Sequence, residues 1–193
     1  MRNENPIHLL VHEHKYILKV VHALSVVDDD LGRGRPVDAE LIRKVVLFMR
    51  DFADKCHHAK EEAILFPAME EKGVPKTGCP LQGLVAEHVK GRQLVTALAA
   101  AAEAYAQGSP DAVEALRGSI SGIRQLYPNH IWKEDEMVFP MAERLFSQEE
   151  LQSMQLLFDK AEAELGQDHD RYVSFADEMA LLHNDEPARE TAD

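Results

Sequence analysis

The chain repeats itself, and this internal repeat limits the folds that it can adopt. The aligned segments are LVHEHKYILKVVHAL at 10–24 with LVAEHVKGRQLVTAL at 84–98, and HHAKEEAILFP at 57–67 with HIWKEDEMVFP at 130–140. The alignment matches His14 with His88 and His57 with His130. We therefore expect two helical hairpins related by a pseudo-twofold axis.

Apolar residues recur every three or four positions over four long stretches, which is the pattern of amphipathic helices. These stretches are 7–24, 42–68, 81–102 and 116–141. Asn5 offers an N-cap, and Pro6 suits the first turn of a helix. Because the links are short and strand alternation is absent, we predict an all-α, antiparallel up-down four-helix bundle. Kinks or helix ends are expected at Pro67, Pro128 and Pro140.

The bundle is expected to occupy residues 1–146 as one domain. SQEE at 147–150 is a capping box, which indicates that another helix begins there. We therefore predict a C-terminal helical extension over 147–183 that packs on the same domain. The last residues, 184–193, are expected to form a disordered tail.

Four histidines and two glutamates lie on the apolar stripes of the expected helices. They are His14, His57, Glu61, His88, His130 and Glu134. Each glutamate follows a histidine by four residues, so both side chains share one helix face. Charged groups in an apolar core must be paired or must bind a metal. Imidazole with carboxylate suits two first-row metal ions; iron is favoured, and manganese or zinc is possible.

Composition narrows the choice of partners. The formal net charge is −13, which argues against nucleic acid or an anionic membrane as a partner. The two cysteines, Cys56 and Cys79, cannot build a disulfide framework. Because the N-terminal residues are polar, we expect no signal peptide. No apolar run is long enough to span a bilayer, so we expect a cytoplasmic protein.

The ligand order resembles the hemerythrin-like (HHE cation-binding) family of bacterial type. The matching pattern is His14, His57-x-x-x-Glu61, His88 and His130-x-x-x-Glu134, within about residues 7–146. The resemblance implies a four-helix bundle that holds two iron ions, bridged by both glutamates and by an oxo or hydroxo group. The H-x-x-x-E order also differs from the Glu-x-x-His order of ferritin-like di-iron bundles.

The chain departs from the oxygen-carrying hemerythrins near His88. Those proteins have an H-x-x-x-H pair, whereas Leu84 and Arg92 occupy the positions four residues before and after His88. We therefore expect a symmetric centre with two histidines per iron and an open position on each. In this respect the chain is more similar to iron-centre-repair proteins and other bacterial hemerythrin-like proteins.

Several neighbouring residues have two possible roles. Tyr127 can donate a hydrogen bond beside the metal ligands, but a packed core tyrosine is the favoured interpretation. Glu13 and Glu87 are expected to face solvent, with a role behind the histidines as the alternative. His58 and Glu62 repeat the spacing of His57 and Glu61. We do not choose them as ligands, because the second repeat has isoleucine and aspartate at these positions.

Three functional hypotheses follow. In the first, the di-iron protein binds or reacts with a small diatomic molecule or peroxide (peroxide, dioxygen or nitric oxide) in a stress or redox response, with a redox protein as a possible partner. In the second, it handles or senses iron without catalysis, including iron-centre repair. In the third, it is a structural helical bundle without metal.

Overall fold

The computed structural model describes residues 5–78, 80–165 and 168–184. Regular structure in these residues is helical, without strands, so the predicted all-α class is confirmed. None of the helices in this part of the chain is long and apolar enough to cross a membrane. Cys79 lies outside the described residues.

The first half of the repeat forms two helical rods. The first rod, α1 (Pro6–Gly32), starts where the cap signal predicted, and the Asn5 side chain accepts a 3.0 Å hydrogen bond from the N–H of Ile7. The second rod changes helix type along its length, with η denoting a π-helix. Its segments are α2 (Ala39–Phe48), η1 (Met49–His58), η2 (Glu61–Leu65) and α3 (Phe66–Glu71).

The second half of the repeat also forms two rods. One is α4 (Leu81–Ala106), and the other runs without a break through three segments. These segments are α5 (Ala112–Lys133), η3 (Glu134–Val138) and α6 (Phe139–Leu145). The second rods of the two halves therefore differ, because the π-helical stretch before the glutamate in η1 has an α-helical counterpart in α5.

Pro67 and Pro140 lie in the first turns of α3 and α6, directly after a π-helical segment. In a π-helix each N–H bonds to the carbonyl five residues earlier, which inserts one extra residue into the turn. The residue before each proline makes such a bond to the glutamate of its repeat, Phe66 to Glu61 and Phe139 to Glu134. The rods thus continue through both prolines, with changed hydrogen bonding, and do not end there.

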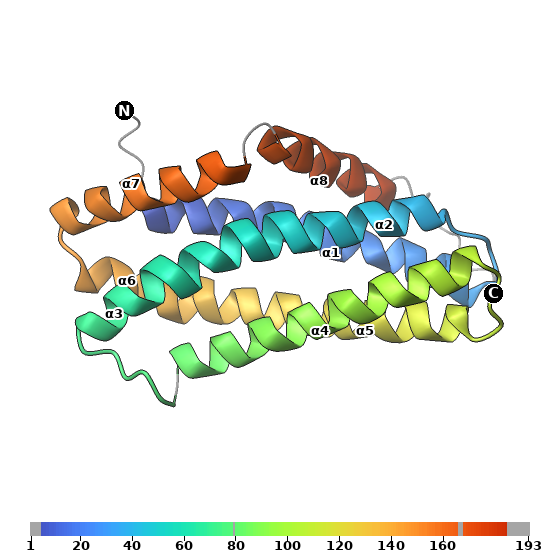
Figure 1. The fold of residues 1–193 in the computed structure, drawn as a ribbon, viewed down its shortest axis with the longest axis horizontal. Helices are drawn as coiled ribbons and strands as arrows, with labels where there is room; N and C mark the ends of the chain where they lie inside the picture. The colour runs from blue at the N-terminus through green and yellow to red at the C-terminus, as the bar shows by residue number, and fades with distance from the viewer. Residues whose placement is uncertain (1–4, 79, 166–167, 185–193) are drawn as a thin grey trace, which may run out of the picture.

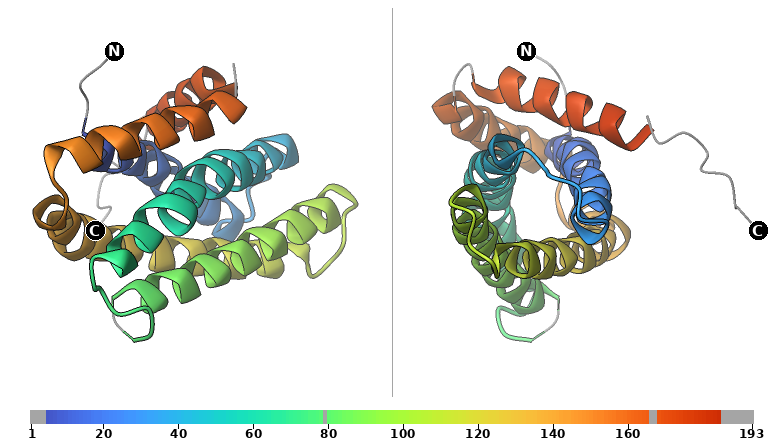
Figure 2. Two further views of the ribbon diagram at one scale, coloured as in Figure 1. Left: turned by 60° about the vertical axis from the view of Figure 1, so that its left-hand side comes forward. Right: turned by 90° about the vertical axis from the view of Figure 1, so that its right-hand side faces the viewer.

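The four rods lie around a common interior, as the right-hand view of Figure 2 shows. α4 packs most extensively against α5 and also against α2, while α1 packs against α5. Links between rods lie at the two ends of the molecule (Figure 1). Each rod therefore presents one long face to the interior, which is where the predicted apolar stripes are buried.

The buried apolar residues form two clusters, one toward each end of the interior. Leu10 and Leu65 belong to one cluster, and Ile17 and Ala53 belong to the other. Along the chain, His14 lies between Leu10 and Ile17. A layer of polar side chains therefore separates two apolar cores, and the apolar neighbours exclude water from it.

Two further helices, α7 (Gln148–Leu165) and α8 (Asp168–Asn184), follow the repeat. The predicted capping box is present, since the Ser147 hydroxyl accepts from the Glu150 N–H and the Glu150 carboxylate accepts from the Ser147 N–H. α8 lies along α1, and α7 contacts α1, η1 and η2 (Figure 2). Of the predicted tail, Asn184 ends α8, and residues 185–193 lie outside the described part.

Candidate metal centre

The structure brings all six predicted ligand residues into one buried layer. None of the six is more than 3% exposed. Each rod supplies one of the histidines, and each of the two glutamates lies one turn after a histidine on the same rod. The residues and their elements are His14 in α1, His57 in η1, Glu61 in η2, His88 in α4, His130 in α5 and Glu134 in η3.

The four histidines form two pairs that meet through their Nε2 atoms. The Nε2 atoms of His14 and His57 are 2.9 Å apart, and those of His88 and His130 are 3.0 Å apart. Each pair contains one histidine from the first rod of a hairpin and one from the second rod. Two nitrogen atoms that converge in this way are suited to share one metal ion.

The two glutamates lie between the histidine pairs. Glu61 has Oε1 at 3.7 Å from His57 Nε2 and Oε2 at 3.4 Å from His88 Nε2. Glu134 has Oε2 at 3.2 Å from His14 Nε2 and Oε1 at 3.1 Å from His130 Nε2. Each carboxylate thus faces one histidine pair with one oxygen and the other pair with its second oxygen. This is the arrangement that a bridging ligand requires.

All four of these carboxylate oxygens are buried, and within the described residues none accepts a hydrogen bond. A buried polar atom without a partner costs about 1–3 kcal/mol, and more when it is charged. Such groups are uncommon in folded proteins and call for an ion or another ligand. The residues therefore fit a pair of metal cations, which would supply the missing positive charge.

The other ring nitrogen of every histidine, Nδ1, bonds to a carboxylate. The pairs are His14 with Asp135 at 2.8 Å, His57 with Glu13 at 2.9 Å, His88 with Glu62 at 2.7 Å and His130 with Glu87 at 3.0 Å. A carboxylate on Nδ1 fixes the ring and its tautomer and leaves Nε2 free as a ligand. Metal-binding histidines characteristically have this support.

The expectation that Glu13 and Glu87 face solvent is wrong. Glu13 is 1% exposed, and Glu87 is partly buried. Both precede a stripe histidine in the sequence and reach across to the histidine of the next rod. Their sequence signal was the EH dipeptide, which occurs once in each repeat.

Comparison with known proteins gives one match. The model of the hemerythrin HHE cation-binding domain matches residues 5–142. This chain belongs to the hemerythrin HHE family. No curated protein and no solved structure matches it. The family and the donor set agree: the family is a cation-binding one, and the histidine and glutamate cluster of this hemerythrin domain could hold a metal ion.

The surroundings of the hemerythrin centre shift the pKa of several of its residues. Burial raises the pKa of Glu61 well above its usual range, and the nearby Glu134 carboxylate raises it further. Burial lowers the pKa of His14, but the carboxylates of Asp135 and Glu134 outweigh this effect and raise it to about 9. Burial keeps the pKa of His57 well below its usual range, so its Nε2 accepts a hydrogen bond from His14. Metal binding must therefore displace protons.

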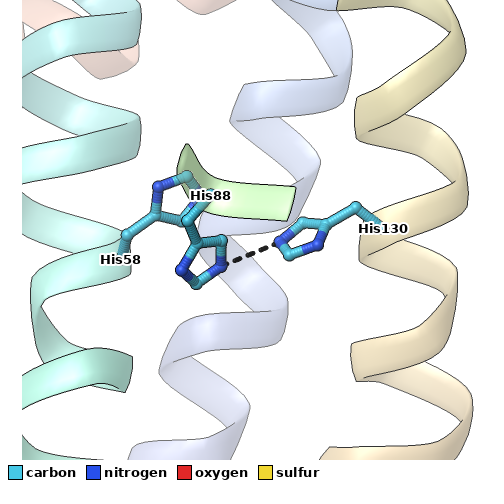
Figure 3. Close-up of side chains that lie close together, drawn as sticks. All are labelled: His58, His88 and His130. Carbon is cyan, nitrogen blue, oxygen red and sulfur yellow. Dashed lines mark hydrogen bonds between the residues drawn. The ribbon is translucent and has the colours of Figure 1, made fainter. Parts of the chain in front are cut away.

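His58 breaks the symmetry of the hemerythrin centre. It is buried, and its ring stacks on His88 with centroids 3.8 Å apart (Figure 3). Its Nδ1 lies 3.3 Å from Asp54 Oδ1, so it too has a carboxylate partner. One nitrogen each from His58, His88 and His130 lies within 4.8 Å of the others, close enough to hold a metal together. The His88–His130 pair therefore has a third histidine beside it, whereas the cluster around His14 and His57 contains only those two histidines among the described residues. The expected symmetry of the centre does not extend to His58.

A cavity of about 220 Å³ lies beside this asymmetric half. Its lining includes His58, Tyr127, Asp54 and Arg92. Tyr127 is buried, with its ring nearly parallel to that of His58. Within the described residues it makes no hydrogen bond to the six ligand residues, and burial raises its pKa, so it stays neutral. Tyr127 thus belongs to the wall of the cavity rather than to the ligand cluster.

Proposed function

We propose that this hemerythrin domain is a non-haem di-iron protein. His14 and His57 would hold one iron, His88 and His130 the other, and Glu61 and Glu134 would bridge them. The observation that carries this proposal is the set of four buried carboxylate oxygens that lack hydrogen-bond donors and lie between two converging histidine pairs. Imidazole and carboxylate together favour iron among the common metals.

The proposed architecture is the antiparallel up-down four-helix bundle, within one domain of residues 1–146. It is supported by the four rods around one interior and by the packing of α1 on α5 and α4 on α2 (Figure 2). Residues 147–183 would then be an extension of this domain, which agrees with the contacts of α7 and α8 to α1.

The iron pair would act on a small oxidant such as peroxide, dioxygen or nitric oxide, in a stress or redox response. Bound iron would supply electron exchange and polarisation of the oxidant. The protein's residues orient the ligand nitrogens and exclude water through the two apolar clusters. The small cavity beside His58 suits a molecule of this size.

Electrons for a reaction would have to come from another molecule, for which a redox protein is the proposed partner. The net charge of −13 supports a basic protein surface, and not nucleic acid or an anionic membrane, as that partner. The free, buried thiol of Cys56 fits a reducing compartment such as the cytoplasm.

A non-catalytic role in iron handling or sensing, including iron-centre repair, is the second candidate. The observation that favours it is a pair of exposed leucines, Leu156 and Leu157, on α7. Exposed leucines on a helix outside the repeat are available to contact a partner protein. In this case iron would be bound and transferred or reported, without turnover.

Anaerobic loading with ferrous iron, followed by peroxide, tests the proposal. We expect two iron ions per chain and a near-ultraviolet absorption change on oxidation. Glu61→Ala and Glu134→Ala should each lower the metal content below two. His12→Ala is the control, because within the described residues the exposed His12 ring of α1 is hydrogen-bonded to Tyr16 alone. Two iron ions per chain in both glutamate variants would contradict the assignment, and a spectral change without turnover would favour the second candidate.

A further inference from the structure

α7 contacts the metal centre although it lies beyond the residues that match the family. The match ends at 142, whereas α7 begins at Gln148. α7 packs against η1 and η2, the segments that carry His57 and Glu61. Phe158 of α7 is fully buried, and the Lys60 ammonium lies 5.7 Å from the centroid of its ring. The extension therefore covers the side chain that directly precedes Glu61.

A continuous series of charged contacts joins α7 to a metal-ligand histidine. The Glu162 carboxylate of α7 accepts a 3.0 Å hydrogen bond from the Lys60 ammonium. Lys60 also donates to Oε1 of Glu13, and Oε2 of Glu13 lies 2.9 Å from His57 Nδ1. Glu13 and Lys60 are both buried. The position of the His57 ring is therefore coupled to a residue of α7 through two intervening side chains.

The second repeat offers a comparison, because it has an equivalent lysine–glutamate pair whose lysine α7 does not bury. Lys133 donates to Glu87, and Glu87 bonds to His130 Nδ1 at 3.0 Å. The Lys133 side chain is 41% exposed, whereas that of Lys60 is 0% exposed. Within the described residues no second carboxylate contacts Lys133. Solvent therefore reaches the lysine that supports His130, and α7 keeps it from the lysine that supports His57.

Burial makes the first series stiff. A buried ammonium requires full pairing, and Lys60 obtains it from two carboxylates. Both carboxylates accept hydrogen bonds from the Lys60 ammonium. A charged Lys60 holds the Glu13 carboxylate in place, and Glu13 in turn holds the His57 ring. In the exposed counterpart water competes for Lys133 and Glu87, and the pair is looser.

We propose that α7 makes the two metal positions inequivalent. Through Glu162, Lys60 and Glu13 it fixes His57, so that a metal ion at the His14–His57 position leaves more slowly than one at the His88–His130 position. Glu162 is a positioning residue in this scheme. The inference rests on the proposed function, because it requires two bound metal ions. It gives the C-terminal extension a role in metal retention.

The test is the release of ferrous iron from the full-length, iron-loaded protein to a ferrous chelator under anaerobic conditions. The wild-type protein is expected to release its iron in two phases of equal size. Glu162→Gln removes the charge but keeps the shape, and it should accelerate the slow phase about tenfold, the lower limit for residues that support a ligand. The fast phase should not change. Glu87→Gln should instead accelerate only the fast phase, which assigns the two phases to the two positions.

Asp177→Asn is the matched control on the extension. Asp177 pairs with Lys19 at 2.6 Å and joins α8 to α1 at an exposed site away from the centre. This variant should leave both phases and the metal content unchanged. The melting temperature of each metal-free variant separates positioning from general loosening, because a loosened fold would accelerate both phases together.

A single phase in the wild-type protein, or equal effects of Glu162→Gln on both phases, would overturn the inference while leaving two iron ions per chain. No effect of Glu162→Gln on the slow phase would overturn it as well. A wild-type protein that binds fewer than two iron ions would instead refute the proposed function, and the inference with it. The two failures are thus distinguishable by metal content.

Discussion

The two repeats place matching ligands at the centre but surround them differently. In the first repeat, the rod that carries the ligands is π-helical before its glutamate, and His58 and Lys60 are buried. In the second repeat the corresponding stretch of α5 is α-helical, and Lys133 is partly exposed. α7 packs against η1 and η2 of the first repeat and buries Lys60. An internal repeat can therefore keep the same potential metal donors in both halves, while differences in helix type and in packing against α7 give the two sets of donors different surroundings.

The largest difference between the halves is expected at the two lysines. Lys60→Met leaves Glu13 and Glu162 near a core without their cation, and breaking a buried ion pair in this way costs about 3–5 kcal/mol. Lys133→Met removes a partly exposed partner and should cost about 0–1 kcal/mol. Urea denaturation of both metal-free variants measures the difference in unfolding free energy. Equal losses would show that α7 does not distinguish the halves.

The next largest effect concerns a feature that both halves share, the glutamates that we propose as metal bridges. Glu61→Leu should abolish the proposed dinuclear site and yet stabilise the metal-free protein. It removes a buried carboxyl group without a hydrogen bond, whose cost is about 1–3 kcal/mol. Metal analysis and thermal unfolding of the metal-free protein check the two statements. A less stable metal-free variant that still binds two ions would contradict both.

The sequence predicted the helices and the six-residue layer because both depend on periodic patterns. Histidines on apolar stripes point inward with their neighbours, and two matched H-x-x-x-E pairs made coincidence improbable. The expectation that Glu13 faces solvent failed because an apolar stripe describes the faces of one helix and not the contacts between neighbouring helices. Glu13 lies beside the inward face, but its long side chain reaches a histidine on the next rod.

The burial of His58 and the change of helix type also have physical reasons. Sequence periodicity assumes 3.6 residues per turn, so it does not indicate where a helix changes to i→i+5 hydrogen bonds. In the first repeat His57, His58, Lys60 and Glu61 are all buried, on an arc of the helix wider than the stripe that comparison of the repeats selected. The contacts of α7 also depend on packing between distant segments, which periodicity does not describe.

Proton release should make metal binding depend on pH, because neighbouring carboxylates raise the pKa of both His14 and His88 against the opposing effect of burial. His14, with a pKa raised to about 9, carries a proton that metal must displace. Apparent affinity at the His14–His57 position should rise about tenfold per pH unit from pH 7 and level off above about 9. Asp135→Asn removes a carboxylate that raises this pKa, so the levelling should occur at lower pH. Glu143→Gln, which affects the exposed His8, is the control. Competition titrations at several pH values measure the slope, and a flat profile would contradict the prediction.

The smallest expected effect comes from His58, a single residue in which the two repeats differ. His58→Ile gives the first repeat the residue that the second repeat has at this position, Ile131. The change removes the ring that stacks on His88 and the third nitrogen beside the His88–His130 pair. Loss of a group that orients or adds to a ligand set lowers metal affinity by roughly tenfold. Only the fast phase of iron release should therefore accelerate, because His58 contacts the ligands of the position that α7 does not cover. If the slow phase responds instead, His58 acts on the first position through its neighbour His57, and the assignment of the asymmetry to the second half is wrong.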